Sequence, residues 1–124
     1  MRGPEQILRE AKTIAVVGAS PDPARPSHGV AAYLERAGYR VLRVNPLCPE
    51  YWPSLASLEE PVDLVDVFRR PEFCAEVARE AAATGAPALW LQLGIRSAEA
   101  RIVAEASGMD YVEDACTAVV HRFL

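Results

Sequence analysis

The sequence predicts one α/β domain, a doubly wound parallel sheet of about five strands with helices on both faces. The predicted strands are short and mainly apolar runs, and the first of them, 13–17, has no polar alternation, which is typical of a strand buried on both faces. These runs alternate with segments of helical periodicity, which favours a parallel sheet with right-handed crossovers. The 124 residues suffice for one core and not for two, so we expect a single domain over residues 1–124. We expect the strand order 3-2-1-4-5.

Each element in the amino-terminal half has its own boundary signals. Pro4 suits the first turn of a short helix, and the apolar run after Lys12 reads as the first strand. Ser27 is a good N-cap for the next helix, and Gly38 is a good residue to end it. In order, we expect a helix over 4–11, a strand over 13–17, a helix over 27–37 and a strand over 39–44.

The second half repeats the alternation after an irregular, proline-bearing stretch at 47–61, which has one helical turn near 54–58. Pro71 opens a helix that Gly85 ends, and Ser97 caps a helix that is followed by Gly108. We expect strands over 62–68, 88–91 and 110–112, helices over 71–84 and 97–107, and a last helix within 114–124.

Composition excludes several function classes. The net charge of −4 does not support a nucleic-acid or membrane surface, and no apolar run approaches the roughly 18 residues that span a bilayer. The first residues lack the apolar core of a signal peptide. Cys48, Cys74 and Cys116 are widely spaced and odd in number, which indicates neither a metal site nor a disulfide framework. We therefore expect a soluble, cytoplasmic, reduced protein without a metal.

The stretch 13–29 has the order that binds anions. A buried strand runs into Gly18, a proline-rich loop follows, and Ser27 begins a helix. Unpaired backbone N–H groups and the positive end of a helix dipole would then face a phosphate. A side chain on residue 18 would strain the turn or fill the space of that phosphate. The alternative is an ordinary strand-to-helix turn.

Arginines recur where the predicted strands end: Arg25 after the first, Arg43 within the second, Arg69 and Arg70 after the third and Arg96 after the fourth. Ligands of doubly wound sheets bind at this edge, beside the first strand. Arginine binds phosphate through two parallel hydrogen bonds and is always charged. We therefore expect a polyanionic ligand; the alternative is a solvated rim of surface arginines.

The residues discriminate among nucleotides. An NAD site carries Gly-x-Gly-x-x-Gly and an acidic residue about 20 positions later, which holds the ribose. This chain has Gly18 and then only Gly29, and it offers Arg43 and Asn45 at the end of the second strand. That combination argues against NAD and suits a ribose with an extra phosphate, as in coenzyme A or NADP.

Five motifs occur in order along the chain. They are Val16-Val17-Gly18-Ala19-Ser20, Arg25-Pro26-Ser27, Val44-Asn45-Pro46, Val65-Asp66-Val67-Phe68-Arg69-Arg70-Pro71 and Trp90-Leu91-Gln92-x-Gly94. Together they resemble one family, the small stand-alone CoA-binding proteins, which are similar to the CoA-binding domain of the succinyl-CoA synthetase alpha subunit. The resemblance covers nearly the whole chain. The resemblance implies a Rossmann-like domain that binds coenzyme A, with the diphosphate at the first loop.

The resemblance also implies roles by position. The first loop, including Arg25, would hold the diphosphate, Asn45 and Pro46 would lie near the adenosine, and Gly94 would flank the exit of the pantetheine arm. The expected cofactor-binding set is Gly18, Ala19, Ser20, Arg25, Ser27, Arg43, Asn45, Pro46, Phe68, Arg69, Gln92 and Gly94. No catalytic residue is assigned.

The carboxyl-terminal stretch departs from the family pattern of Asp-Arg-Cys with a later His. Asp114, Cys116 and His121 match, whereas Ala115 replaces the arginine. On a helix, positions 116 and 121 are about 140° apart, so a direct Cys–His pair is not expected. We interpret Cys116 as a small buried residue. The alternative is a functional thiol that forms a disulfide with the thiol of CoA.

Asp66 lies inside an apolar strand, where an unpaired carboxylate is costly. We expect it to bond to neighbouring backbone N–H groups; the alternative is a ligand contact.

The function hypothesis is a module that binds CoA or an acyl-CoA and acts as a carrier, sensor or regulator without catalysis of its own. One alternative is an NADP-linked or acyl-CoA-handling enzyme that uses Cys116. Another is an interaction domain that binds no nucleotide. The acyl group, the protein partner and the oligomeric state stay open.

Overall fold

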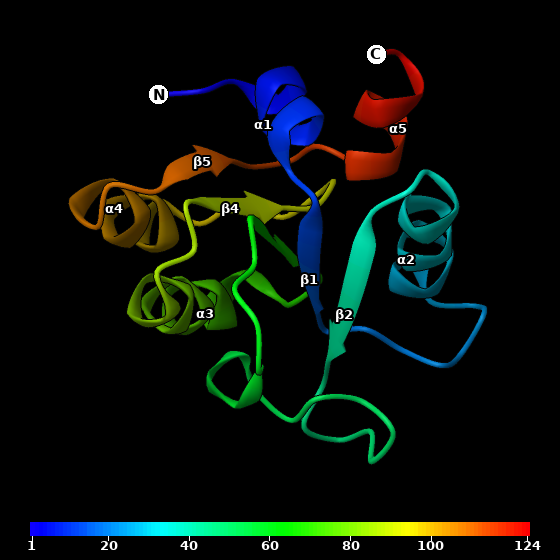
Figure 1. Ribbon diagram of the computed structural model, residues 1–124. Coiled ribbons are helices and arrows are strands. Elements are labelled where there is room, and N and C mark those ends of the chain that lie inside the picture. Colours follow the sequence, from blue (N-terminus) through cyan, green and yellow to red (C-terminus); the bar gives the residue numbers. More distant parts are fainter.

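The computed structural model describes residues 1–124 and contains one parallel sheet of five strands (Figure 1). This confirms the predicted α/β class. The strands are β1 (Thr13–Val17), β2 (Arg40–Val44), β3 (Leu64–Val67), β4 (Ala88–Leu91) and β5 (Asp110–Val112). The helices are α1 (Pro4–Glu10), α2 (Pro26–Arg36), α3 (Pro71–Thr84), α4 (Ala98–Ala106) and α5 (Thr117–Arg122), with a 3-10 turn η1 (Leu55–Ser57).

Two apolar cores cover the two faces of the sheet, with α1, α2 and α5 over one face and α3, α4 and η1 over the other. Side chains of β1 alternate between them: Ile14 and Val16 join the first core, and Ala15 and Val17 join the second. The unbroken apolar run of β1 therefore reflects burial on both faces, as the sequence predicts. No helix is both long and apolar enough to cross a bilayer.

The strand order is β2-β1-β3-β4-β5, so the predicted order 3-2-1-4-5 is wrong. β3 pairs with β1 and does not lie outside β2. Right-handed crossovers run in opposite directions over opposite faces of a sheet. α2 connects β1 to β2 over one face, whereas Leu55 in the connection from β2 to β3 packs into the core of the other face. This change of face reverses the direction and brings β3 to the far side of β1. The switch point of the sheet thus lies between β1 and β3.

The helix starts differ in how they are capped. Ser97 caps α4 as predicted, because its hydroxyl accepts a hydrogen bond from the Ala100 N–H at 3.1 Å. Ser27 is not a cap: α2 begins at Pro26 with Arg25 as its N-cap residue, and Ser27 is 3 % exposed inside the first turn. Proline at the first helical position, which needs no N–H, shifts the boundary by one residue. The Ser27 hydroxyl is therefore left free of a capping role.

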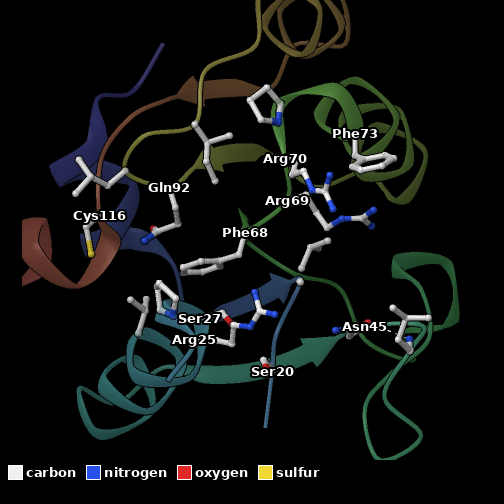
Figure 2. A pocket seen from close by; sticks show the side chains of 18 of the residues that line it. Ser20, Arg25, Ser27, Asn45, Phe68, Arg69, Arg70, Phe73, Gln92 and Cys116 are labelled. Carbon is white, nitrogen blue, oxygen red and sulfur yellow. Dashed lines mark hydrogen bonds between the residues drawn. The ribbon is translucent and has the colours of Figure 1, made fainter. Parts of the chain in front are cut away.

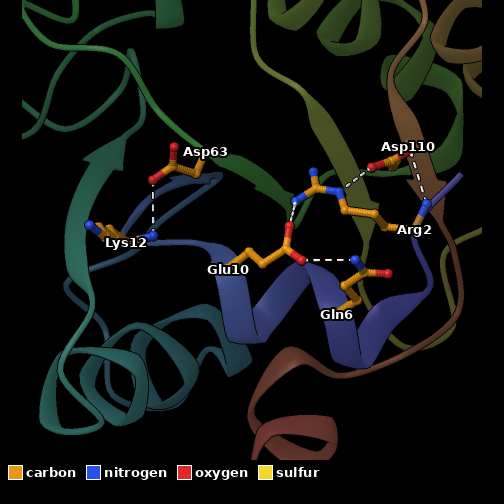
Figure 3. A network of polar contacts seen from close by, with 6 residues as sticks. All are labelled: Arg2, Gln6, Glu10, Lys12, Asp63 and Asp110. Atoms are coloured by element: carbon orange, nitrogen blue, oxygen red, sulfur yellow. Dashed lines mark hydrogen bonds and ion pairs between the residues drawn. The ribbon is translucent and has the colours of Figure 1, made fainter.

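Charge pairs close the amino-terminal edge of the sheet (Figure 3). The Asp63 carboxylate accepts hydrogen bonds from the backbone N–H groups of Lys12 and Thr13, both at 2.9 Å. The Arg2 guanidinium contacts Asp110 at 2.6 Å and Glu10 at 3.0 Å. These pairs hold the starts of β1 and β5. At this edge carboxylates pair with the Arg2 guanidinium, and Asp63 is satisfied by backbone N–H groups.

Candidate functional site

A cavity of about 990 Å³ lies at the carboxyl-terminal edge of the sheet (Figure 2). Its size lies at the upper end of the range for small-molecule sites. It is lined by the segments that follow β1, β2, β3 and β4 and by Cys116. Of the predicted set, the lining includes Gly18, Ser20, Arg25, Ser27, Asn45, Pro46, Phe68, Arg69 and Gln92.

The cavity is cationic in an acidic protein. Its lining holds Arg25, Arg69 and Arg70 and no aspartate or glutamate, although the chain carries a net charge of −4. None of the three guanidinium groups forms an ion pair with a carboxylate. The Arg69 guanidinium stacks 4.5 Å from the centre of the Phe73 ring, which orients it and leaves its N–H edge free. This arrangement suits an anionic ligand with several charges.

The amino-terminal turn of α2 offers unused hydrogen-bond donors. Ser27 is 3 % exposed and lines the cavity, and neither its hydroxyl nor its backbone N–H has a partner in the protein. The Ser20 N–H is also unpaired. Such donors at the positive end of an 11-residue helix attract a phosphate.

The donors expected from the first residues of the loop are already used. The N–H groups of Gly18 and Ala19 both point to the Val44 carbonyl, at 2.9 and 3.3 Å, and so extend the pairing of β1 with β2. Ala19 is 1 % exposed and is not part of the cavity wall. The unpaired donors therefore begin at Ser20, two residues later than the sequence predicts.

Asn45 fixes the wall through both of its polar atoms. Its Nδ2 donates to the Ala19 carbonyl at 2.8 Å, and its Oδ1 accepts from the Leu47 N–H at 2.9 Å. The His28 ring Nδ1 lies 3.1 Å from the Ser20 carbonyl and ties the other end of the loop to α2. Asn45 thus holds the loops after β1 and β2 together, which leaves its apolar edge and Pro46 to face a ligand.

Gly18 is required by its neighbour across the switch point. Its φ is +85°, and a Cβ at this position would overlap the Phe68 carbonyl oxygen and lie 3.0 Å from the Phe68 carbonyl carbon. The residue therefore permits the close approach of the ends of β1 and β3. A side chain on residue 18 would therefore collide with the backbone of Phe68, whereas the sequence predicted a collision with a bound phosphate.

Two further predicted residues, Arg43 and Gly94, lie outside the lining of the cavity. Arg43 donates two hydrogen bonds to the Glu35 carboxylate, at 2.9 and 3.0 Å, because alternation along β2 turns it toward α2. The Gly94 N–H donates to the Asp114 carboxylate at 2.7 Å, so Gly94 holds the turn while its neighbours Leu93 and Ile95 face the cavity. The structure does not bring Arg43, Ala19 or Gly94 into the lining.

Sequence reasoning missed most of the apolar lining. These residues are Val17, Pro26, Val30, Leu47, Pro71, Phe73, Leu93 and Ile95. Leu47 is 90 % exposed and Leu93 is 70 % exposed, each in a loop after a strand. An apolar side chain in a loop that follows a strand, outside any helical or strand periodicity, is the signal that could have identified Leu47 and Leu93.

A buried polar chain orients Gln92. The Gln92 Oε1 accepts from the Thr117 N–H at 3.0 Å and lies 3.1 Å from the Thr117 hydroxyl, which also lies 2.9 Å from Asp66 Oδ2. The hydroxyl has one proton for two acceptors, so a protonated Asp66 that donates to Thr117 satisfies all three groups. The Gln92 amide NH2 is left without a protein partner, on a side chain 4 % exposed at the cavity wall.

Burial accounts for the protonation of Asp66. The side chain is fully buried, its Oδ1 has no partner, and desolvation raises the pKa to about 8 against the weaker opposing effect of the Thr117 hydrogen bond. Asp66 therefore bonds to a side chain of α5 and not to backbone N–H groups as the sequence predicts. The carboxyl group does not line the cavity.

This pKa predicts a pH-dependent stability. A carboxyl group whose pKa is higher in the folded state stabilises the fold fully below its unfolded pKa, and this contribution is lost as the pH rises toward about 8. We expect Asp66→Asn, which stays neutral and can donate to Thr117, to flatten the fall in unfolding free energy between about pH 4 and 8. Urea titrations across this range measure it. Parallel profiles for the two proteins would contradict a protonated Asp66.

Similarity to known proteins extends over nearly the whole chain. Residues 12–122 match the family described as CoA binding domain. The uncharacterized protein YneT of Bacillus subtilis is 38 % identical over 122 residues, which cover 94 % of this chain and 90 % of YneT. A solved structure from Thermus thermophilus has a TM-score of 0.90 and 40 % identity over 98 % of each chain.

A larger protein shares the fold at lower identity. The dinucleotide-forming acetyl-coenzyme A synthetase 1 of Ca. Korarchaeum cryptofilum has a TM-score of 0.70 and 22 % identity. The likeness covers 81 % of this chain and 25 % of the synthetase. At this identity the likeness concerns the fold alone.

Proposed function

Because this chain belongs to the CoA-binding domain family, we propose that it binds coenzyme A, free or as an acyl thioester, in the cavity at the carboxyl ends of the strands. It acts there as a carrier, sensor or regulatory module without catalysis of its own. The observation that carries the proposal is the set of three arginines without carboxylate partners beside the unused donors of α2.

The diphosphate is placed in the middle of the cavity. Figure 2 shows Arg25 and Ser27 on one side and Arg69 and Arg70 across from them. A diphosphate in this position accepts hydrogen bonds from the Ser27 hydroxyl and N–H and from the guanidinium groups. The diphosphate thereby neutralises arginines that have no carboxylate partner in the protein.

The adenosine is placed toward Asn45, Pro46 and Leu47. The proline and leucine side chains supply an apolar surface for the base. No carboxylate of this region lines the cavity. The two free ribose hydroxyls of NAD therefore find no carboxylate to bind them here, whereas they do in an NAD site. The additional phosphate on the ribose of CoA meets no negative charge there.

The pantetheine arm is placed along Leu93 and Ile95 toward Gln92 and Cys116. The arm combines short apolar stretches with amide groups. The free amide NH2 of Gln92 can donate a hydrogen bond to a carbonyl oxygen of the pantetheine arm. The side chains of Leu93 and Ile95 cover the apolar stretches of the arm. The lining offers no histidine or carboxylate for proton transfer, which supports binding over catalysis.

A thermal-unfolding panel with CoA, acetyl-CoA, NADP, NAD and ATP tests the proposal. A ligand at 100 times its dissociation constant stabilises the folded state by about 2.7 kcal/mol. We expect CoA and acetyl-CoA to raise the unfolding temperature strongly and NAD to raise it little. Equal stabilisation by NAD and CoA, or none by CoA, would contradict the proposed ligand.

A further inference from the structure

The buried chain of Asp66, Thr117 and Gln92 has a definite arrangement of protons when Asp66 is protonated. The Asp66 carboxyl group then donates to the Thr117 hydroxyl at 2.9 Å, and this hydroxyl donates to Gln92 Oε1 at 3.1 Å. The Thr117 N–H donates to the same Oε1 at 3.0 Å. Both contacts hold the amide with its oxygen toward Thr117, so its NH2 is the group left for the cavity.

An ionised Asp66 reverses the direction of the Thr117 hydroxyl. A carboxylate only accepts hydrogen bonds, so the hydroxyl must donate to Asp66 and turn a lone pair toward Gln92 Oε1. Two acceptors then lie 3.1 Å apart. A flip of the amide would relieve this contact but would bring the NH2 against the Thr117 N–H. Neither orientation of Gln92 satisfies Thr117, so the NH2 is fixed toward the cavity only while Asp66 holds its proton.

No charged group competes with Thr117 for Asp66. The carboxyl group lies on the sheet face covered by α1, α2 and α5, and its neighbours in register are Val16 and Trp90, both fully buried. It forms no ion pair, and its one hydrogen bond is to Thr117. Burial raises its pKa to about 8, opposed only by that hydrogen bond. The exclusion of water, and not a neighbouring charge, therefore keeps Asp66 protonated.

The titratable groups on and beside those three helices bind elsewhere or face solvent. The His121 ring lies 2.9 Å from the Tyr33 hydroxyl, and the His28 ring lies 3.1 Å from a backbone carbonyl of the first loop. The Cys116 thiol, just before α5, is half-buried at the cavity wall and not fully buried as the sequence predicts. The remaining groups are exposed: Glu5, Arg9, Glu10, Glu35, Arg36 and Arg122.

Gln92 lies where the pantetheine arm of the proposed ligand ends. In Figure 2 it lies beside Cys116, at the end of the cavity away from Asn45. A ligand whose phosphates contact Ser27 and Arg25 reaches this end with its arm. The polar groups of the arm are amides, and an acyl thioester adds a further carbonyl oxygen. A fixed N–H donor suits these oxygens, whereas an amide turned the other way would present an oxygen to them.

Resting on the proposed function, we propose that Asp66 and Thr117 are positioning residues that fix Gln92 as a hydrogen-bond donor, so that the cavity binds the carbonyl groups of the arm most tightly while Asp66 is protonated. Binding and protonation are then linked in both directions. A rise in pH that ionises Asp66 weakens binding, and a bound ligand keeps the proton on Asp66. The binding module thereby responds to pH through a group that does not itself line the cavity.

Isothermal titration calorimetry with acetyl-CoA from about pH 6.5 to 9 tests the proposal. This ligand has no free thiol that would ionise in the same range. We expect the affinity of the parent protein to fall about 2-fold to 10-fold as the pH rises, the contribution of one hydrogen bond. Asp66→Asn carries an amide NH2 that donates to Thr117 at every pH. This variant should therefore keep its affinity at the upper end of the range, where the parent loses it.

Two further measurements separate positioning from a structural role. Thr117→Val removes the hydroxyl but keeps the N–H that holds Gln92, so it should flatten the pH profile independently of Asp66→Asn. The second measurement uses 3′-phospho-ADP, which is CoA without its pantetheine arm and does not reach Gln92. It should bind the parent and Asp66→Asn with equal affinity at each pH.

The outcomes distinguish this proposal from the proposed function. Parallel pH profiles of acetyl-CoA binding for the parent and Asp66→Asn would overturn the role of Asp66 and leave the proposed function standing. A difference between the two proteins that appears equally with 3′-phospho-ADP would do the same. An absence of binding of both CoA and acetyl-CoA throughout the pH range would overturn both proposals.

Discussion

Gly18→Ala is expected to lower the free energy of unfolding by about 3 kcal/mol or more. Two costs combine at this position. The φ of +85° is unfavourable for any residue with a Cβ, by about 1–2 kcal/mol. The added Cβ also overlaps the Phe68 carbonyl oxygen, and backbone at the end of a buried strand cannot move aside as a flexible side chain could. Urea titration followed by circular dichroism measures the change.

Gly85→Ala is the matched control for the second cost. Gly85 has a φ of +80°, close to that of Gly18, but a Cβ there meets nothing within 4 Å. The control should lose only about 1–2 kcal/mol, the cost of the dihedral angle. Equal losses in the two variants would contradict a close approach of β1 and β3 at Gly18. A folded Gly18→Ala protein should also bind CoA more weakly, because the loop that leads to Ser20 is displaced.

Arg69→Ala and Arg25→Ala are each expected to weaken CoA binding by about 1.5–3 kcal/mol, the range for hydrogen bonds to charged groups. This corresponds to a loss of affinity of roughly 10-fold to 150-fold. The loss at Arg69 should be at the upper end, because Phe73 orients its guanidinium, whereas Arg25 is exposed and has no such contact. Isothermal titration calorimetry with CoA gives both values.

Arg79→Ala is the matched control for charge. Arg79 is exposed on α3, has no carboxylate partner and lies outside the cavity. Its removal changes the net charge equally and should leave the CoA affinity unchanged. None of the three substitutions should alter the unfolding free energy by more than about 0.5 kcal/mol. Affinity equal to that of the parent in both cavity variants would show that the arginines form a solvated rim.

The elements of the fold were predictable because each has a local cause. All five strands were predicted, and Pro71, Gly85 and Ser97 marked helix ends that the structure confirms. The strand order was not predictable in the same way. It depends on which face the segment between β2 and β3 crosses, and only the tertiary packing of Leu55 decides this.

The sequence predicted those residues of the candidate site that lie in the segments after the strands. Arg69 and Gln92 lie just after strands, Arg25 ends the loop that follows β1, and the structure brings all three to one cavity. Arg43 failed this rule because it lies inside β2, where alternation turns it toward Glu35. The unpaired donors were placed two residues too early because β1 continues its pairing with β2 through Gly18 and Ala19. Such extensions depend on a neighbouring strand and leave no local signal.

A crystal structure of the complex with CoA tests the central claim most directly. The account predicts the diphosphate within hydrogen-bond distance of the Ser27 hydroxyl and the Arg69 guanidinium, with the thiol at the end of the cavity formed by Gln92 and Cys116. The adenine then lies toward Asn45 and Pro46. CoA bound outside this cavity, or bound in it with the diphosphate away from the first turn of α2, would contradict the account.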